Sequence, residues 1–147
     1  MEFTIDIPEI PRVQAQLSRL QSSLMDWQTA MATIGAAYKS YFSSVPFASR
    51  GSVFGTTWPD LNPQYESWKA DHYPGKPILI RTGALSEGFD FTSTRNAVKI
   101  FNSVEYFRDH QQGIGVPQRV MMALNDERKQ AAYDIILDEL NRKVRNA

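Results

Sequence analysis

Hydrophobic residues recur through the first third of the chain at alternating intervals of three and four positions. Before that series begins, Phe3, Ile5 and Ile7 alternate with polar residues, which is the pattern of a half-buried strand over residues 2–7. The series itself consists of Ile10, Val13, Leu17, Leu20, Leu24, Trp27, Met31, Ile34, Tyr38 and Tyr41. It predicts one helix with a heptad-like apolar stripe over about residues 11–44, ended by Pro46.

A helix of that length does not fit within a domain of this size. At about 1.5 Å per residue it is roughly 50 Å long, whereas a compact domain of this chain length has a radius of gyration of about 15 Å. The helix must therefore bend, with Gly35 as the expected weak point, or project and pack against another subunit.

The other faces of this helix are almost free of charge. Between Val13 and Ser44, only three side chains are charged, at Arg19, Asp26 and Lys39. Small neutral residues allow a second helix or a neighbouring chain to approach, although an ordinary polar surface is an alternative interpretation. We therefore expect an assembly surface on this helix, formed by Trp27, Ala30, Ala37, Tyr38 and Tyr41.

Residues 45–78 form a long excursion rich in proline, glycine and aromatic residues. Asn62 and Pro63 are a good N-cap and first-turn pair, which predicts a short helix over about residues 63–71. The preceding segment, residues 49–55, is expected to be a mobile loop, with Trp58 and Tyr65 anchoring its exit.

The region after residue 78 predicts a small sheet with short helices. Strands are expected at residues 78–80, 89–92, 97–101 and 120–124, and the middle two form a hairpin. Thr82 can cap a one-turn helix, and a second short helix follows Ser103 and ends at Gly113.

The last segment predicts an amphipathic helix capped by Asn125 or Asp126. Its apolar stripe consists of Tyr133, Ile136, Leu137, Leu140 and Val144, and the pairs Asp138–Arg142 and Glu139–Lys143 are spaced to support it. The predicted fold is therefore α+β: a small antiparallel or mixed sheet packed by a long N-terminal helix and a C-terminal helix. One domain is expected over residues 1–147, with the long helix at 11–44, the extended region at 45–78 and the sheet and helix body at 78–147.

Composition narrows the functional classes. The chain has 147 residues, 42% of them hydrophobic and 12% aromatic, which is typical of a folded globular protein. Sixteen basic residues balance sixteen acidic ones, so no global field favours nucleic acid or an anionic membrane. The chain has no apolar run of about 18 residues and no leader-like start, so we expect neither membrane insertion nor secretion by that route.

Catalytic and metal-binding patterns are weak. With no cysteine and only His72 and His110 as histidines, thiolate catalysis and cysteine-based metal sites are excluded, and we expect no metal or organic cofactor. Gly75-Lys76-Pro77 lacks the P-loop spacing, and Gly113-Ile114-Gly115 follows a helix rather than a strand. A serine, histidine and aspartate brought together across the fold, or a pair of carboxylates, stays open, but no nucleophile elbow supports the first. An enzyme is not expected.

Three stretches together resemble one protein family. Gly55, Trp58 and Leu61, followed by Tyr65 and Lys69, are similar to its G-x-x-W-x-x-L segment and downstream lysine. Further matches lie in its L-x-x-T-G-x-L segment and in its Y-x-x-x-H-Q-x-G and P-x-R tail, at Leu79, Thr82, Gly83, Leu85, Tyr106, His110, Gln111, Gly113, Pro117 and Arg119. The family is the bacteriophage virion morphogenesis, or tail completion, proteins. The match covers about residues 50–125, in the family's order.

The resemblance implies a structural virion protein with no covalent chemistry. It implies tail completion or head–tail joining at the neck, assembly in the host cytoplasm, and contacts with connector, neck or tail-tube proteins. A homo-oligomeric ring is expected, with six copies because the tail tube that the family implies is generally sixfold. The matched residues themselves look structural: Trp58, Leu61 and Tyr65 can fix the excursion to the sheet. Lys69 and Arg119 can pair with acids of the same or an adjacent subunit.

Two other classes were weighed against this one. A small hydrolytic enzyme carried on the virion would need a polar cleft whose point mutants lose activity. A nucleic-acid-binding module would show a steep salt dependence, and the basic residues near Arg142 instead complement the end of a helix.

Overall fold

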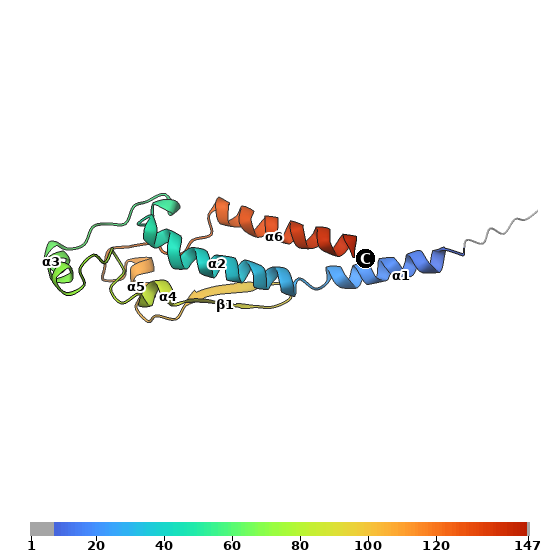
Figure 1. Ribbon diagram of the computed structural model, residues 1–147, viewed down its shortest axis with the longest axis horizontal. Coiled ribbons are helices and arrows are strands. Elements are labelled where there is room, and N and C mark those ends of the chain that lie inside the picture. The colour runs from blue at the N-terminus through green and yellow to red at the C-terminus, as the bar shows by residue number, and fades with distance from the viewer. Residues whose placement is uncertain (1–7, 147) are drawn as a thin grey trace, which may run out of the picture.

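The computed structural model describes residues 8–146 and is elongated, with helix α1 at one end and α3 to α5 at the other (Figure 1). The strand predicted for residues 2–7 lies outside the described residues. No helix of the described part is long and apolar enough to cross a membrane.

The predicted N-terminal helix is two helices, α1 (Ile10–Leu24) and α2 (Gln28–Ala48). The chain does interrupt the helix as its length demanded, but at residues 25–27 and not at Gly35. The Asp26 carboxylate accepts a hydrogen bond from the Gln28 N–H at 3.0 Å, and the Trp27 N–H donates to the Arg95 carbonyl at 3.1 Å. These bonds replace the helical ones, because aspartate readily satisfies the free N–H groups of a helix start.

Gly35 and Pro46 have different roles from those expected of them. A Cβ atom on Gly35 would lie 2.2 Å from a ring carbon of Phe91, so this glycine allows the hairpin to approach α2 closely. Pro46 lies inside α2, which continues to Ala48, and its ring is fully buried. The prediction that Pro46 ends the helix at about residue 44 was wrong by four residues, because a proline near the last turn removes only one helical hydrogen bond.

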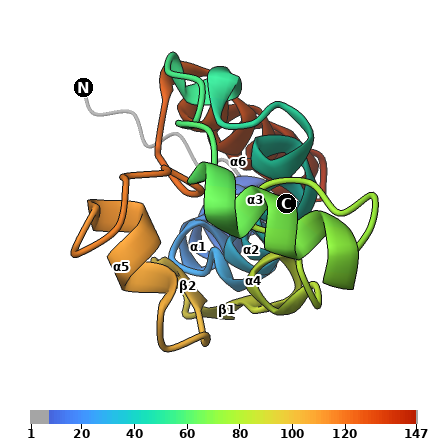
Figure 2. The ribbon, with the colours of Figure 1, turned by 90° about the vertical axis from the view of Figure 1, so that its left-hand side faces the viewer.

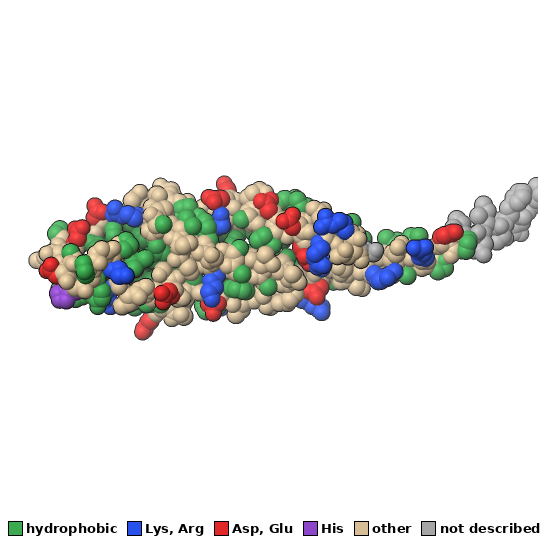
Figure 3. All heavy atoms as spheres, viewed as in Figure 1, with side chains coloured by type: hydrophobic (Ala, Val, Ile, Leu, Met, Phe, Trp, Pro, Cys, Tyr) green, Lys and Arg blue, Asp and Glu red, His purple; other side chains and the backbone are tan. Residues whose placement is uncertain are grey.

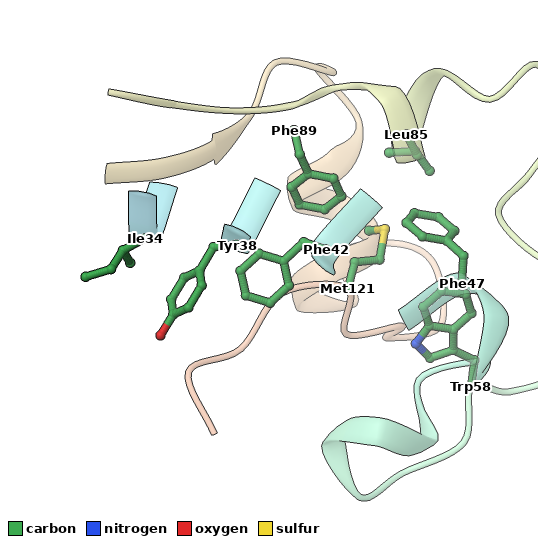
Figure 4. Close-up of a cluster of buried hydrophobic side chains, with 8 residues drawn as sticks. All are labelled: Ile34, Tyr38, Phe42, Phe47, Trp58, Leu85, Phe89 and Met121. Carbon is green, nitrogen blue, oxygen red and sulfur yellow. The ribbon is translucent and has the colours of Figure 1, made fainter. Parts of the chain in front are cut away.

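Helix α2 is the centre of the fold. It packs against the hairpin on one side and against α6 (Asp126–Arg145) on the other, so the body has three layers (Figure 1). The core follows α2 along its length and is formed by Ile34, Tyr38, Phe42, Phe47, Trp58, Leu85, Phe89 and Met121 (Figure 4). Phe42 is 2% exposed and lies between Tyr38 and Phe89. Such aromatic contacts provide most of the apolar burial that holds the layers together.

The sheet is a single antiparallel hairpin in the described residues. Strand β1 (Phe89–Ser93) pairs with β2 (Val98–Asn102) from Phe89 opposite Asn102 to Ser93 opposite Val98. The predicted hairpin and the α+β class are confirmed. The short helices are α3 (Pro63–His72), α4 (Ala84–Glu87) and α5 (Phe107–Gln112).

The strands predicted at residues 78–80 and 120–124 were wrong. Residues 77–80 form a turn, in which the Ile80 N–H donates to the Pro77 carbonyl at 3.0 Å and Leu79 has φ of 61°. In the second segment, the backbone of Met121 and Met122 bonds to the side chain of Gln111 instead of to a strand. Both apolar runs are partly buried although their backbone is irregular. Hydrophobicity alone does not distinguish such a segment from a strand.

The segment after α2 is a packed turn, so the prediction of a mobile loop there was wrong. It contains a short 3₁₀ helix, Ser52–Phe54, and the Trp58 N–H donates to the Arg50 carbonyl at 2.7 Å. Gly51 has φ of 79°, and a Cβ atom there would lie 2.2 Å from the Trp58 indole. Trp58 anchors the exit as expected, whereas Tyr65 is 40% exposed and does not.

Helix α6 buries the predicted stripe only in part: Ile136 and Leu140 are half-buried, as expected. Asn125 caps it, with its side chain accepting from the Arg128 N–H. Tyr133, Leu137 and Val144 are 57%, 39% and 54% exposed, while Glu139 and Lys143 are buried. Lys143 can be buried because its ammonium donates to the Ser23 carbonyl at 2.8 Å. The Glu139 carboxylate binds the Arg142 guanidinium at 2.6 Å. Arg142 is therefore paired with Glu139, and the predicted Asp138–Arg142 pair does not form.

Candidate functional site

Most residues of the recognised sequence motifs line one cavity of about 480 Å³ at the end of the molecule opposite α1. Figure 2 looks onto this end, where α3, α4 and α5 lie. The motif residues that line the cavity are Leu61, Tyr65, Lys69, Leu79, Thr82, Gly83, Leu85, Tyr106, His110, Pro117 and Arg119. Residues from Leu61 to Arg119 are thus brought to one site.

Helix α3 carries Lys69 into this site. The Asn62 side chain caps the helix by accepting from the Gln64 N–H at 2.9 Å, as the sequence predicted. Lys69 lies two turns further on, is only 4% exposed, and donates to the Pro77 carbonyl. Lys69 does not pair with an acid of its own subunit, since its partner within the described residues is a backbone oxygen, and pairing with an acid of an adjacent subunit stays a prediction.

The opposite wall comes from the turn before α4. Leu79 and Gly83 both have positive φ, at 61° and 92°. For leucine this conformation is strained, and strain of this kind persists only where the surroundings enforce it. The Thr82 hydroxyl accepts weakly from the Ala84 N–H, at 3.4 Å, and Gly83 is the N-cap residue, so the predicted cap forms one residue later than expected.

Arg119 closes the floor of the cavity. It is 4% exposed and donates through Nε and one amino nitrogen to the carbonyl oxygens of Pro59 and Asp60, at 2.9 to 3.1 Å. It therefore holds the excursion to the segment after α5. This role joins two motifs that are far apart in the sequence, but the bonds again go to backbone and not to an acid.

The motif residues that do not line the cavity hold the segment behind it. Gln111 accepts from the N–H groups of Met121 and Met122 and donates to the Met122 carbonyl. The Trp58 indole donates to the Val120 carbonyl at 2.9 Å. Gly113 ends α5 with φ of 73°, and Gly55 ends the 3₁₀ helix with φ of 93°. These residues position Arg119 through its neighbours.

Burial and repulsion dominate the electrostatics of the cavity. Desolvation lowers the pKa of Lys69, and the charges of Arg119 and Arg81 lower it further. Desolvation also lowers the pKa of His110, with Arg119 acting in the same direction and Asp109 against it. The cations of the site thus lie close enough to repel one another.

The polar residues of the cavity do not form a metal-ligand cluster or a catalytic triad among the described residues. In the described part of the chain, no group of three or more histidine, aspartate or glutamate side chains gathers as a metal site would require. Neither histidine makes the hydrogen bond to a carboxylate that a triad requires: the His72 imidazole contacts the Trp68 carbonyl, and His110 Nδ1 has no partner among the described residues. What the cavity offers is positive charge, hydrogen-bond donors and apolar walls.

A model of the phage virion morphogenesis family matches residues 9–141. The chain belongs to this family. The chain matches no curated protein and no solved structure. The virion morphogenesis family gives the protein a structural role in building a phage particle. Since the family match begins at residue 9, it also covers α1 and α2, in which the sequence showed no recognisable motif.

Four lining residues were not among the predicted site residues: Asn62, Arg81, Ala84 and Val116. Arg81 stands directly before Thr82 in the recognised motif, and its charge was the signal that could have identified it. Val116 lies in an irregular turn and carries no comparable signal.

The predicted assembly surface on α2 is largely covered by the chain itself. Ala30 and Tyr38 are 1% and 5% exposed, and the Tyr38 hydroxyl donates to the Arg128 carbonyl of α6. Tyr41 lies under the Arg128 guanidinium at 3.6 Å, and Trp27 lies 5.6 Å from the Lys143 ammonium. Among the five predicted residues, Ala37 alone is exposed. The prediction was therefore wrong for Ala30 and Tyr38, because α6 and the hairpin cover both sides of α2.

Helix α1 is the exposed part of the predicted stripe. None of its residues is buried, and Ile10, Val13 and Leu17 are 46%, 49% and 60% exposed. Figure 3 shows it as a narrow extension with hydrophobic side chains on its surface. It contacts α6 near its C-terminal end, where the Lys143 ammonium donates to the Ser23 carbonyl.

Proposed function

We propose that this protein completes the tail or joins head and tail at the neck of a phage, and that it does so as a ring of identical subunits. Family membership supports a morphogenetic role. The observation that carries the ring is α1: an amphipathic helix that buries none of its own apolar residues within the subunit. In water such a stripe is stable only when something else covers it.

A second copy of the chain offers a surface that matches the α1 stripe. Helix α6 leaves Tyr133, Leu137 and Val144 exposed along one line. The α1 stripe spans residues 10–24, about 20 Å at the rise of a helix, and the α6 line spans residues 133–144, about 17 Å. We infer that α1 of one subunit packs on this line of the next. We take the contact to be heterologous, since the two surfaces differ, and a contact of this kind gives a ring of fixed copy number where the rotation between neighbours closes.

Introducing charge into the apolar stripe of α1 tests the ring. The double variant Val13→Glu with Leu17→Glu places two carboxylates in the apolar contact, so the protein should stay folded but become monomeric. The matched control, Ala15→Glu with Ser22→Glu, adds the same charge on the opposite face and should leave the assembly unchanged. Sedimentation and negative-stain images report the mass and shape. Six copies is the number expected for the wild type, and a monomeric wild type, or rings formed equally by the apolar-face variant, contradicts the ring.

The neck position needs a separate measurement. Images of intact particles with the subunit tagged at an exposed position should show density at the head–tail junction. Particles lacking the protein should carry tails that do not join to heads. Density elsewhere on the particle would overturn the neck assignment and leave the family assignment intact.

A further inference from the structure

The cavity is lined by cations without a lining acid. Lys69, Arg81 and Arg119 contribute positive charge to it, and no aspartate or glutamate of residues 8–146 lines it. Asp60 acts on Arg119 from outside: its carboxylate binds Arg50 at 2.6 Å, and its side chain is 87% exposed. A buried charge is normally paired with an opposite one.

Backbone carbonyls compensate these cations only in part. Lys69 uses one of its three N–H bonds on the Pro77 carbonyl. Arg119 bonds through Nε and one amino nitrogen, so its other amino nitrogen has no hydrogen-bond partner in the described residues. Donors and charge are therefore left over at the floor of the cavity, where the lysine and the arginine are each 4% exposed.

His110 adds a third unsatisfied group. Its Nδ1 atom is buried and has no hydrogen-bond partner within the described part of the chain. Buried polar atoms in folded proteins are nearly always paired, so the polar groups around this cavity are incompletely satisfied by the subunit itself.

The walls around these polar groups are apolar. The apolar lining includes Leu61, Leu79, Leu85, Val116 and Pro117. A cavity of about 480 Å³ lies in the usual range of binding pockets. A ligand that fits must present one anionic group to the floor and an apolar group to the walls.

We propose that the cavity binds the C-terminal carboxylate of a partner protein whose last residue is apolar. The inference rests on the proposed function, because the partner is then another protein of the virion. A chain end enters a recessed site carboxylate first and places its last side chain against the walls, which an acidic side chain in mid-chain does less readily. Nucleic acid fits poorly, because phosphate contacts need an open row of basic residues.

Short peptides test this proposal on the full chain. One peptide ends in Gly-Phe-Leu with a free carboxylate, a second is the same peptide amidated, and a third is amidated and carries an internal glutamate. Calorimetry should show binding of the first at least about tenfold tighter than either of the others, since charge-assisted hydrogen bonds are lost. Equal affinity for the amidated peptide overturns the proposal, and tighter binding of the internal glutamate overturns the choice of a chain end.

Arg81 provides the variant test without endangering the fold. Arg81 lines the cavity and is exposed. The central carbon of its guanidinium lies 5.7 Å from the centre of the Tyr73 ring. Arg81→Gln should weaken binding of the free-carboxylate peptide about fivefold. The matched control Arg108→Gln removes an exposed arginine on α5 that does not line the cavity and should leave the affinity unchanged. Equal effects of the two variants would indicate a general charge effect and overturn the site.

Competition and the assembly variant complete the design. The peptide is also competed with inorganic phosphate and with a short DNA oligonucleotide. Displacement by either one at micromolar concentration would indicate that the cavity binds phosphate groups and would overturn the proposal. The binding is also measured in the Val13→Glu, Leu17→Glu double variant. Since α1 lies at the other end of the molecule, peptide affinity there should equal that of the wild type, so failure of the ring and failure of the cavity are distinguishable.

Discussion

The two ends of this molecule depart from the usual distribution of residues in opposite ways. At one end, α1 exposes apolar side chains that a soluble protein ordinarily buries. At the other end, the cavity buries Lys69 and Arg119, which are ordinarily exposed. Between them, the layers around α2 follow the common rule, with aromatic and aliphatic residues inside. The middle of the molecule thus supplies the stability, while each end carries groups that the subunit itself leaves exposed or incompletely paired.

Removing the buried charge at the cavity should have the largest effect on stability. Arg119→Ala deletes the donors to the Pro59 and Asp60 carbonyls and leaves these oxygens without partners. The expected loss is about 3 kcal/mol in the free energy of unfolding, measured by urea denaturation. A Leu17→Ala variant of α1 should change the same quantity by less than about 0.5 kcal/mol in the monomer. Equal losses in the two variants would contradict the contrast between the two ends.

The junction of α1 with the body should show an intermediate effect. Lys143→Met keeps the aliphatic stem but deletes the hydrogen bond to the Ser23 carbonyl. We expect a loss of about 1 kcal/mol in global stability. The more specific result is faster amide exchange confined to residues 22–27, seen by NMR. Protection there equal to that of the wild type would show that Lys143 does not hold α1.

The smallest effect concerns pH. Burial lowers the pKa of His110 below its ordinary value of 6.5, so the folded protein binds fewer protons than the unfolded chain as the pH falls through that value. The free energy of unfolding should therefore decrease between pH 7 and pH 5. His110→Gln should make this decrease smaller.

A control separates this effect from acid titration. The Glu139 pKa is lowered from 4.5, mainly by the hydrogen bond from Arg142, so the stability that Glu139 contributes is lost only at more acidic pH. A pH dependence between 7 and 5 that is identical in the histidine variant would show that another group is responsible.

The sequence predicted the elements that local chemistry determines. Asn62 and Asn125 cap their helices as expected, the hairpin forms at the predicted positions, and most of the motif residues line one cavity. That they would converge could not be derived, because the contacts from Lys69 and Arg119 go to carbonyl oxygens, which every residue possesses. Only the folded chain shows which carbonyl is near.

The failures have a common physical cause. The apolar residues 120–124 predicted a strand. The backbone of that segment instead forms hydrogen bonds with the side chains of Gln111 and Trp58. The buried face of α6 was predicted only in part. Glu139 and Lys143 pair with each other, and Lys143 also donates to the Ser23 carbonyl at the end of α1, so both side chains can be buried. In both cases a long-range side-chain contact overrode the hydrophobic pattern. The organisation as one domain over the whole chain stays a prediction.

The interruption at residues 25–27 makes α1 a lever. It is joined to the body by a few hydrogen bonds around Asp26, Trp27 and Ser23, and no buried side chain of its own fixes its direction. With 15 residues it is about 22 Å long, so a rotation of about 10° at the junction displaces its tip by about 4 Å. A subunit built in this way can follow a neighbour whose spacing differs slightly from its own without disturbing the layers around α2. In an assembled particle, strain from mismatched components would be taken up at this hinge.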